Sequence, residues 1–369
     1  MVIAVPSISV LGQQGLFGLR ALVWGLVIAM ILQAKLFDAI VARRLRTLVL
    51  VVLLSNMMVA LVQAVVGLNA VEMQALVEAG ASYQVESQTR LLGLQATGQE
   101  LSMLAGSGFV WACAVVVSRG FRRTGALVWT LGILSAVVTL VVLQRSALVG
   151  AFAAMAVVIF SMGSATFRGR RGASARRFGV VVGAALVSIS VLAVVAPDRV
   201  DLALSRFATL FGLSTDYSFS VRQDTTLPVA LRLIGEQPLG YGLGASGPVA
   251  ARYAPAGPLA DFPLGGIAAD NGYLYMALQV GIPGLILFGI FLLSWAICGS
   301  FVELAPRDRL APRAVVTYLG AIMISGSFWG LTGSMAVVVI LASINDSRHV
   351  SEHAGQPSVQ SVDRLESNG

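Results

Sequence analysis

Apolar runs of about 18 or more residues recur along this chain, and they constrain its fold more than any other feature. A helical run of that length crosses the hydrocarbon core of a bilayer. Lipid offers backbone N–H and C=O groups no hydrogen-bond partner, so such runs must form helices. The chain of 369 residues is 57% hydrophobic and 12% charged. The sequence therefore predicts an all-α, polytopic membrane protein with no separate soluble domain.

The apolar runs define eight candidate spans, with boundaries good to about four residues. These spans are 16–34, 47–68, 101–118, 124–144, 146–164, 178–196, 274–298 and 314–344. The last would be roughly 45 Å long as one straight helix, which is too long for one crossing. "GSFWGLTG" at 326–333 would let it turn as a hairpin of two short helices. The expected architecture therefore has about eight or nine transmembrane helices.

Positive charge gathers in every second connector between these runs. The basic connector residues are Lys35, Arg43, Arg44 and Arg46, then Arg119, Arg122 and Arg123, then the arginines of 168–177, then Arg307, Arg309 and Arg313. By the positive-inside rule these connectors are cytoplasmic. The net charge of +7 then reflects membrane topology and does not indicate nucleic-acid binding, because short basic connectors meet anionic lipid headgroups.

This orientation divides the chain into parts with different surroundings. Residues 1–196 and 274–344 are expected to form the transmembrane bundle, with a short outer loop at 69–100. Residues 197–273 become one large extracytoplasmic loop, and its aromatic, Pro and Gly content predicts a partly helical, folded cap. The polar tail at 345–369 is predicted to be disordered and cytoplasmic.

Several kinds of chemistry are excluded by what the chain lacks. Its two histidines, His349 and His353, both lie in the tail, which removes a Ser-His-Asp triad and histidine proton relays in the membrane. Cys113 and Cys298 lie within apolar runs and suggest no disulfide. The G-x-G-x-x-G spacing at 242–247 has no strand before it, so we interpret it as a glycine-rich turn. No metal and no cofactor is predicted.

Arginine and carboxylate side chains remain as the reactive groups at the outer face. Arg145 stands between two apolar runs with almost no loop, either snorkelling to the headgroups or facing the bundle as a fixed cation. Arg222 precedes a predicted short helix and is either a solvated loop residue or a ligand contact. Guanidinium groups bind phosphate oxygens bidentately and stay charged when partly desolvated. Such arginines suit an anionic, membrane-anchored substrate.

The segment after Arg222, "QDTTLPVALRLIGEQPLGYGLG", predicts an amphipathic helix lying on the bundle. Pro228 suits a first helical turn, and Pro238 with Gly240 ends the helix. The candidate capping residues are Asp224, Thr225 and Thr226, and the predicted apolar stripe is Leu227, Leu231 and Ile234.

Asp270 and Asn271 stand directly before the apolar run that begins at residue 274. Either side chain can cap the helix by accepting free backbone N–H groups of its first turn. Asp270 can also act as a base, since a helix N-terminus stabilises a carboxylate as its anion. The two interpretations are compatible.

Four segments resemble a known family, the bacterial O-antigen ligase and O-antigen polymerase group of membrane glycosyltransferases. They are "TRLLGLQATGQELSMLAG" at 89–106, "QRSALVGAF" at 144–152, the segment 222–244, which is similar to the family's Arg-led helix followed by Pro-x-x-Gly-x-Gly, and "DNGYLYMALQVGIPGLIL" at 270–287. They occur in the family's order, with the long outer loop in the family's place. The family frequently has histidine where this chain has Asp270, and the aspartate favours polymerase over ligase.

The resemblance implies inverting glycosyl transfer from an undecaprenyl-diphosphate-linked oligosaccharide to an acceptor glycan, without metal. In this mechanism Asp270 is the general base, and Arg145 and Arg222 bind the diphosphate leaving group. The further expected substrate-binding residues are Arg90, Arg206, Tyr241 and Asn271. The expected location is the bacterial cytoplasmic membrane, with the active site facing outward and with a flippase and a chain-length regulator as possible partners.

Other functions fit the same composition. An O-antigen ligase would transfer the finished glycan to lipid A core or to a protein. A lipid-linked glycan flippase or a small-anion transporter would also be multi-span, although the sequence contains no internal repeat. A structural membrane scaffold is the least specific alternative.

Overall fold

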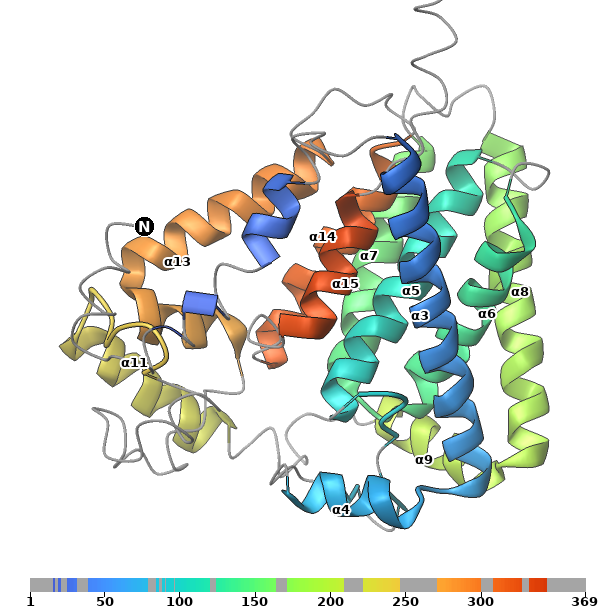
Figure 1. Cartoon of the computed structure of the whole chain (residues 1–369), viewed down its shortest axis with the longest axis horizontal. Helices are drawn as coiled ribbons and strands as arrows, with labels where there is room; N and C mark the ends of the chain where they lie inside the picture. The colour runs from blue at the N-terminus through green and yellow to red at the C-terminus, as the bar shows by residue number, and fades with distance from the viewer. Residues whose placement is uncertain are drawn as a thin grey trace, which may run out of the picture.

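The computed structural model describes residues 16, 19–20, 25–31, 39–78, 84–85, 88–89, 91–95, 97–119, 124–163, 171–208, 222–245, 271–299, 308–326 and 332–343. Within these residues the chain is helical, apart from one antiparallel pair of very short strands, β1 (Gln84–Val85) and β2 (Gln88–Thr89). The helices are α3 (Ala39–Val66), α4 (Ala70–Glu78), α5 (Gly98–Arg119), α6 (Ala126–Val141), α7 (Arg145–Gly163), α8 (Arg171–Val195), α9 (Pro197–Ala208), α11 (Leu227–Glu236), α13 (Gly272–Cys298), α14 (Leu310–Ile322) and α15 (Thr332–Ser343). A π-helical turn (Arg222–Thr226) precedes α11, and a 3₁₀ turn (Met323–Ser325) follows α14. Figure 1 shows their arrangement.

Five of the described helices are long and apolar enough to cross a membrane. They are α3, α5, α7, α8 and α13, while α6, α14 and α15 are shorter apolar helices. The run at 314–344 is divided as expected, since α14 ends at Ile322 and α15 begins at Thr332. Of the predicted first span, 16–34, only scattered residues and the helical stretch 25–31 are described. A count of eight or nine spans therefore stays a prediction.

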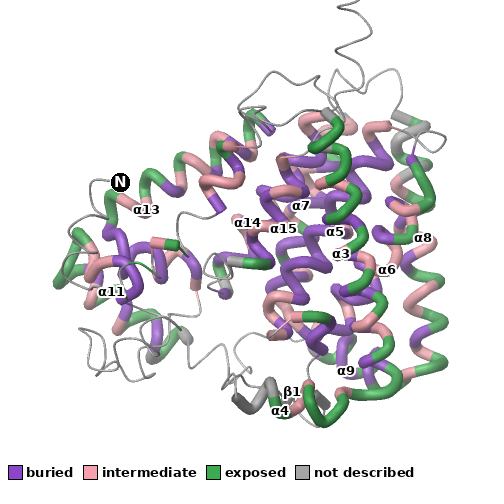
Figure 2. Tube along the Cα trace, viewed as in Figure 1, coloured by how far each residue is buried: buried purple, intermediate pink, exposed green. Residues whose placement is uncertain are grey.

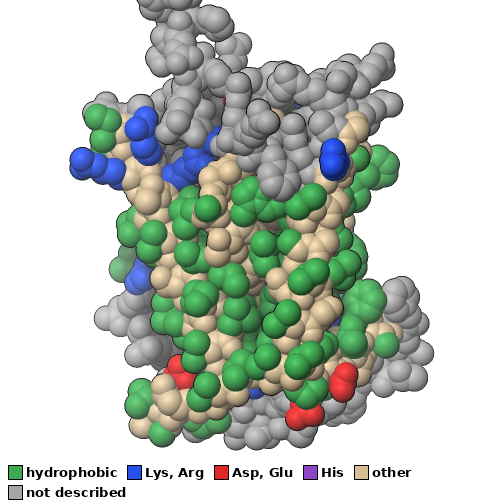
Figure 3. Space-filling view, turned by 90° about the vertical axis from the view of Figure 1, so that its right-hand side faces the viewer, with side chains coloured by type: hydrophobic (Ala, Val, Ile, Leu, Met, Phe, Trp, Pro, Cys, Tyr) green, Lys and Arg blue, Asp and Glu red, His purple; other side chains and the backbone are tan. Residues whose placement is uncertain are grey.

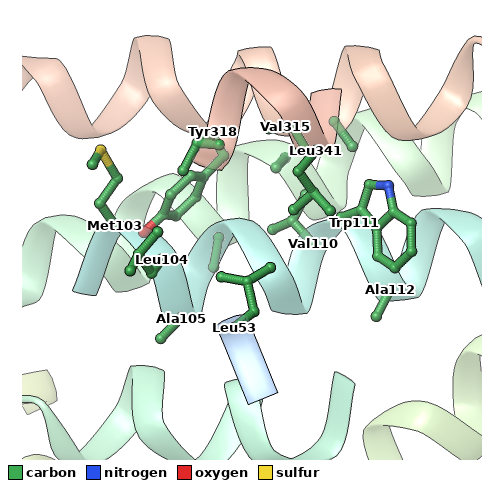
Figure 4. Packing of buried hydrophobic residues seen from close by; sticks show 14 of the residues in the cluster. Leu53, Met103, Leu104, Ala105, Val110, Trp111, Ala112, Val315, Tyr318 and Leu341 are labelled. Carbon is green, nitrogen blue, oxygen red and sulfur yellow. The ribbon is translucent and has the colours of Figure 1, made fainter. Parts of the chain in front are cut away.

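Helix α5 lies at the centre of the bundle and is buried along most of its length (Figure 2). It contacts α3, α6, α7, α14 and α15. Lipid provides no hydrophobic force between helices, so close packing over small residues must hold them together. The ring of Tyr318 on α14 fits between Gly106 of α5 and Gly150 of α7, where an added methyl group would overlap it. Its hydroxyl donates to the Ser102 carbonyl at 2.8 Å, and Figure 4 shows the ring among its apolar neighbours.

The two ends of the bundle differ in charge. Figure 3 shows Lys and Arg side chains gathered at one end, Asp and Glu at the other, and a belt of hydrophobic side chains between. We call the first the basic end; it includes the exposed Arg43, Arg44 and Arg176 at the starts of α3 and α8. The acidic end includes the exposed Asp198 and Asp201 of α9. This separation is what the alternating basic connectors predict for a membrane protein.

A tight turn joins α6 to α7 at the acidic end. Leu143 in this turn has a positive φ of 63°, which is uncommon for a residue with a side chain. Its side chain is buried against Leu202 and Ala203 of α9, so packing offsets the backbone strain. Helix α9 thus closes the bundle beneath the α6–α7 turn. It is one of the two helices described within the predicted cap.

Part of the predicted outer loop 69–100 enters the bundle. Its residues Leu91, Leu92 and Gly93 are buried. The Gln63 carboxamide of α3 accepts the N–H groups of Leu92 at 3.0 Å and Gly93 at 2.8 Å. Asn56, about 15 Å along α3 from its end, accepts the Leu94 N–H at 3.0 Å. Non-helical backbone is tolerated at this depth because the protein satisfies its hydrogen bonds.

Candidate functional site

The start of α13 is capped by Asn271. Its Oδ1 accepts the N–H groups of Tyr273 at 2.9 Å and Leu274 at 3.2 Å, and its backbone is extended as a capping residue requires. Asp270, the predicted base, lies outside the described residues. The sequence allowed either Asp270 or Asn271 to cap the helix, and the structure shows that Asn271 does so. Because its Oδ1 is used for capping, the group that Asn271 can offer to a ligand is the Nδ2 donor.

The first turn of α13 is fixed on the end of α14. The Tyr273 hydroxyl donates to the Gly320 carbonyl at 2.7 Å. Gly272 lies so close to Met323 that an added Cβ would stand 2.8 Å from the methionine Cε. Residues 271–273 therefore have a defined position against the 318–323 region of α14 and its 3₁₀ turn.

Arg145 begins α7 at the same end of α14. Gly150, about 7.5 Å further along α7, packs against Ile322 and Tyr318 of α14. Helices α7 and α13 thus both start beside the last turns of α14. Neither has an acidic residue in its first turn. Their partial positive N-termini, together with the Arg145 guanidinium, make this part of the acidic end favourable for an anion.

Ser146, next to Arg145, is a residue to which the sequence assigned no role. It is only 6% exposed, and its Oγ has no hydrogen-bond partner in the described part of the chain. A buried hydroxyl normally finds a partner, so an unpaired one in the first turn of a helix stands out. Ser146 is visible in "QRSALVG" at 144–150, but an isolated serine beside an apolar run does not by itself indicate a functional site.

Two of the other predicted arginines, Arg206 and Arg222, lie in described helical elements, and the third, Arg90, does not. Arg206 belongs to α9, whose neighbouring Phe207 stacks against Phe152 of α7 with 6.0 Å between ring centroids. Arg206 and Arg145 are thus on two helices in contact. Arg222 begins the π-helical turn before α11. Arg90 lies outside the described residues.

Arg199 of α9 is a further cation at the acidic end. It is nearly buried, and this desolvation lowers the pKa of its guanidinium. No role for Arg199 was predicted from the sequence. Its burial follows from the amphipathic packing of α9, in which Arg199 shares a face with the buried Val200 and Ala203.

Helix α11 forms where it was predicted, but with a different buried face. Pro228 lies in its first turn as expected. Thr226 precedes the helix without a side-chain capping bond, because the chain enters through a π-helical turn. Of the predicted stripe only Ile234 is buried, while Leu227 is 38% and Leu231 54% exposed. The buried residues of α11 are instead Ala230 and Ile234, and Ile234 packs with the half-buried Leu233 against Ala277 and Leu278 of α13.

The glycine loop, residues 238–244, packs against a break in α13. Gly281 has φ 72° and ψ −179°, which interrupts the helix. Pro283 has no N–H for the Gln279 carbonyl, and the Ile282 N–H is turned to the Pro238 carbonyl at 2.8 Å. The carbonyls of residues 278 and 279 thereby lose their helical donors. They accept instead the N–H groups of residues 241 and 242, at 2.8 and 3.1 Å.

Tyr241 takes part in this attachment. Its hydroxyl donates to the Leu233 carbonyl of α11 at 3.2 Å. Partial burial raises the pKa of Tyr241, the Glu236 carboxylate raises it further, and the Arg232 guanidinium opposes the shift. The side chain is therefore a neutral donor that fastens the glycine loop to α11. Its expected contact with substrate stays a prediction.

The predicted site residues thus fall into two groups. Arg145 and Arg206 belong to the contacting helices α7 and α9, and Asn271 and Tyr241 to the unit of α11, the glycine loop and α13. The end of α14 contacts both α7 and the start of α13. Comparison with models of known protein families, with curated proteins and with solved structures finds no match to this chain. The resemblance to the O-antigen group therefore rests on the four sequence segments.

Proposed function

We propose that this protein is a metal-independent membrane glycosyltransferase that joins undecaprenyl-diphosphate-linked repeat units into a polysaccharide. The observation that supports it most is that α7 and α13 both begin beside the C-terminal end of α14. Arg145 and Asn271 stand at the starts of these two helices, whose N-termini favour an anion. A diphosphate leaving group and a carboxylate base need this proximity.

In the proposed reaction, the oxygen of an acceptor sugar hydroxyl attacks the anomeric carbon of the donor from the face opposite the diphosphate. The bond to the diphosphate oxygen breaks, and its electron pair leaves with the diphosphate. Asp270 takes the hydroxyl proton, while Arg145 and Arg222 stabilise the negative charge that develops on the leaving group. The configuration at the anomeric carbon is inverted.

The proposed setting is the bacterial cytoplasmic membrane, with eight or nine spans and the site facing the periplasm or exterior. The charge difference between the two ends of the bundle supports this orientation, since Arg145 lies opposite the basic end. The segment 197–273, which includes α9 and α11, would cover the site from outside. A flippase supplying the donor and a chain-length regulator would act beside it.

The test is the polymer made in cells by arginine variants. Arg145→Ala and Arg222→Ala should each abolish polymer while the protein still inserts in the membrane, because each removes charge from the leaving-group site. Arg232→Ala is the control, since Arg232 is an exposed arginine of α11 that pairs only at the surface with Glu236. Normal polymer in both site variants would overturn the mechanism.

Asp270→Asn tests the base separately. Because Asn271 caps α13, this substitution leaves the cap in place and removes only the group that accepts a proton. We expect polymer formation to fall by about 10²–10⁴-fold, the usual contribution of a general base. Activity within a few-fold of the unsubstituted protein would exclude Asp270 from proton transfer.

A ligase and a polymerase differ in what accumulates without the protein. Loss of a polymerase leaves lipid-linked single repeats, whereas loss of a ligase leaves full-length lipid-linked chains. Analysis of lipid-linked glycans in a deletion strain would therefore decide between the two glycosyltransferases.

A transporter is the second candidate, because discontinuous helices such as α13 often form transporter substrate sites. In those proteins the unwound carbonyls coordinate the transported ion. Here the carbonyls of Leu278 and Gln279 already accept N–H groups of the glycine loop, which favours a structural break. Purified protein in liposomes should join added donor units without moving them across the bilayer. Translocation without polymer growth would favour the transporter.

A further inference from the structure

The surface of α11 divides into three sectors. Ala230 and Ile234 face α13 and are buried. Leu227 and Leu231 lie next to this buried sector, within about 60° of Ile234 around the helix axis, and are exposed. Arg232 and Glu236 occupy the opposite flank and form an exposed ion pair at 3.6 Å. The apolar arc of α11 is therefore wider than the part that the protein covers.

The exposed leucines of α11 continue into the exposed face of α13. Leu239, which follows α11, is 68% exposed and its backbone lies against Gly281. The next residue of α13, Ile282, is 43% exposed, and beyond it Ile286 and Ile290 are 55% and 56% exposed on the same side of the helix. A helix with such a face and the apolar composition of a membrane span must meet lipid there.

The length and tilt of α13 limit how far this surface lies from the basic end. The arm from Ile282 to Cys298 has about 17 residues and is about 25 Å long. It ends at Gly299, which contacts Arg309 at the start of α14, near the basic end. Helix α13 runs obliquely to the bundle helices (Figure 1), so Gly281 lies at most about 25 Å from the basic end, within the thickness of a hydrocarbon core of about 30 Å. The exposed ion pair of Arg232 and Glu236 needs water, which places α11 at the boundary of that core rather than inside it. The glycine loop fixes α11 at this level.

We infer that α11 is an interfacial helix that inserts Leu227, Leu231 and Leu239 among lipid acyl chains at the outer boundary of the bilayer, with Arg232 and Glu236 toward water. Amphipathic helices bind membranes in this way when their apolar face is buried several ångström below the headgroups. This contact with lipid does not depend on which reaction the protein performs. Helix α11 would then rest on the membrane surface at the edge of the segment 197–273.

Spin labels report the surroundings of each sector. In a background with Cys298→Ser, single cysteines at Leu231 and Leu239 carry a nitroxide, and single cysteines at Arg232 and Glu236 serve as controls on the polar side. All four positions are exposed, so the labels should not disturb packing. The labelled proteins are placed in lipid nanodiscs, and power saturation is measured with oxygen, which concentrates in lipid, and with a nickel chelate, which stays in water.

We expect labels at residues 231 and 239 to be relaxed several-fold more by oxygen than by the nickel chelate, with the reverse at residues 232 and 236. Stronger relaxation by the nickel chelate at 231 and 239 would put these leucines in water and overturn the inference. Low accessibility to both reagents would also overturn it, because it would mean that protein covers this face. The polymer assay and the spin-label measurement are independent, so either can fail while the other gives the expected result.

Discussion

At the scale of single residues, two glycines make the break in α13 possible. Gly281 has a backbone conformation that is essentially restricted to glycine, and Gly240 has φ 85°. Their backbones also touch, since a Cβ on Gly240 would lie 2.5 Å from the Gly281 nitrogen. Conformation and contact therefore both exclude a side chain at these positions. The glycine loop and the break at Gly281 therefore fit together as two parts of one contact.

Gly281→Ala should destabilise the protein by about 2 kcal/mol or more, from backbone strain and overlap with the Pro238 carbonyl. Thermal unfolding of the purified protein in detergent should show a lower midpoint. Gly289→Ala on the same helix is the matched control, because nothing lies within 4 Å of its would-be Cβ. Equal midpoints for the two variants would show that the break is not required.

At the scale of elements, α3 supports a buried non-helical segment with two amide side chains. Gln63 and Asn56 are two helical turns apart and are 3% and 1% exposed. Gln63 also donates to the Gly93 carbonyl at 3.1 Å and to Glu72 of α4 at 2.8 Å. One side chain thus joins α3, α4 and the 91–95 segment, which leads directly into the central helix α5.

Gln63→Leu should leave the buried N–H groups of Leu92 and Gly93 without an acceptor, each at a cost of about 1–3 kcal/mol. We expect a lower unfolding midpoint and faster proteolysis of the 69–97 region. Gln237→Leu, at an exposed position after α11, should leave both measurements unchanged. A Gln63→Leu protein as stable as this control would mean that other groups satisfy the segment.

At the scale of the whole molecule, the charge difference between the two ends predicts the orientation in the membrane. Asp201→Cys at the acidic end should react with a membrane-impermeant maleimide in intact cells, while Arg176→Cys should react only after the cells are opened. Cys298→Ser removes the exposed native thiol, and Cys113 is buried. The opposite labelling pattern would invert the topology and remove the proposed outward-facing site.

Much of this architecture was predictable, and the failures have a common cause. The starts of α7 and α13 fall within a few residues of the predicted spans, because apolar run length and flanking polar residues act locally. The expected packing of Leu227 and Leu231 against the bundle was wrong, because both side chains are exposed. An apolar residue can face lipid as readily as it faces a protein neighbour. A pattern of hydrophobicity cannot distinguish these two surroundings.

The sequence by itself determined the helical, membrane-spanning class and the charge asymmetry, since both follow from the cost of placing backbone and charge in lipid. Only the tertiary structure decided which helix ends meet. The convergence of α7 and α13 on α14 depends on glycine contacts at positions 150 and 272. The donors for the break in α13 come from about forty residues earlier in the chain. These helix contacts and hydrogen bonds join residues that are far apart in the sequence, so no local pattern of residues predicts them.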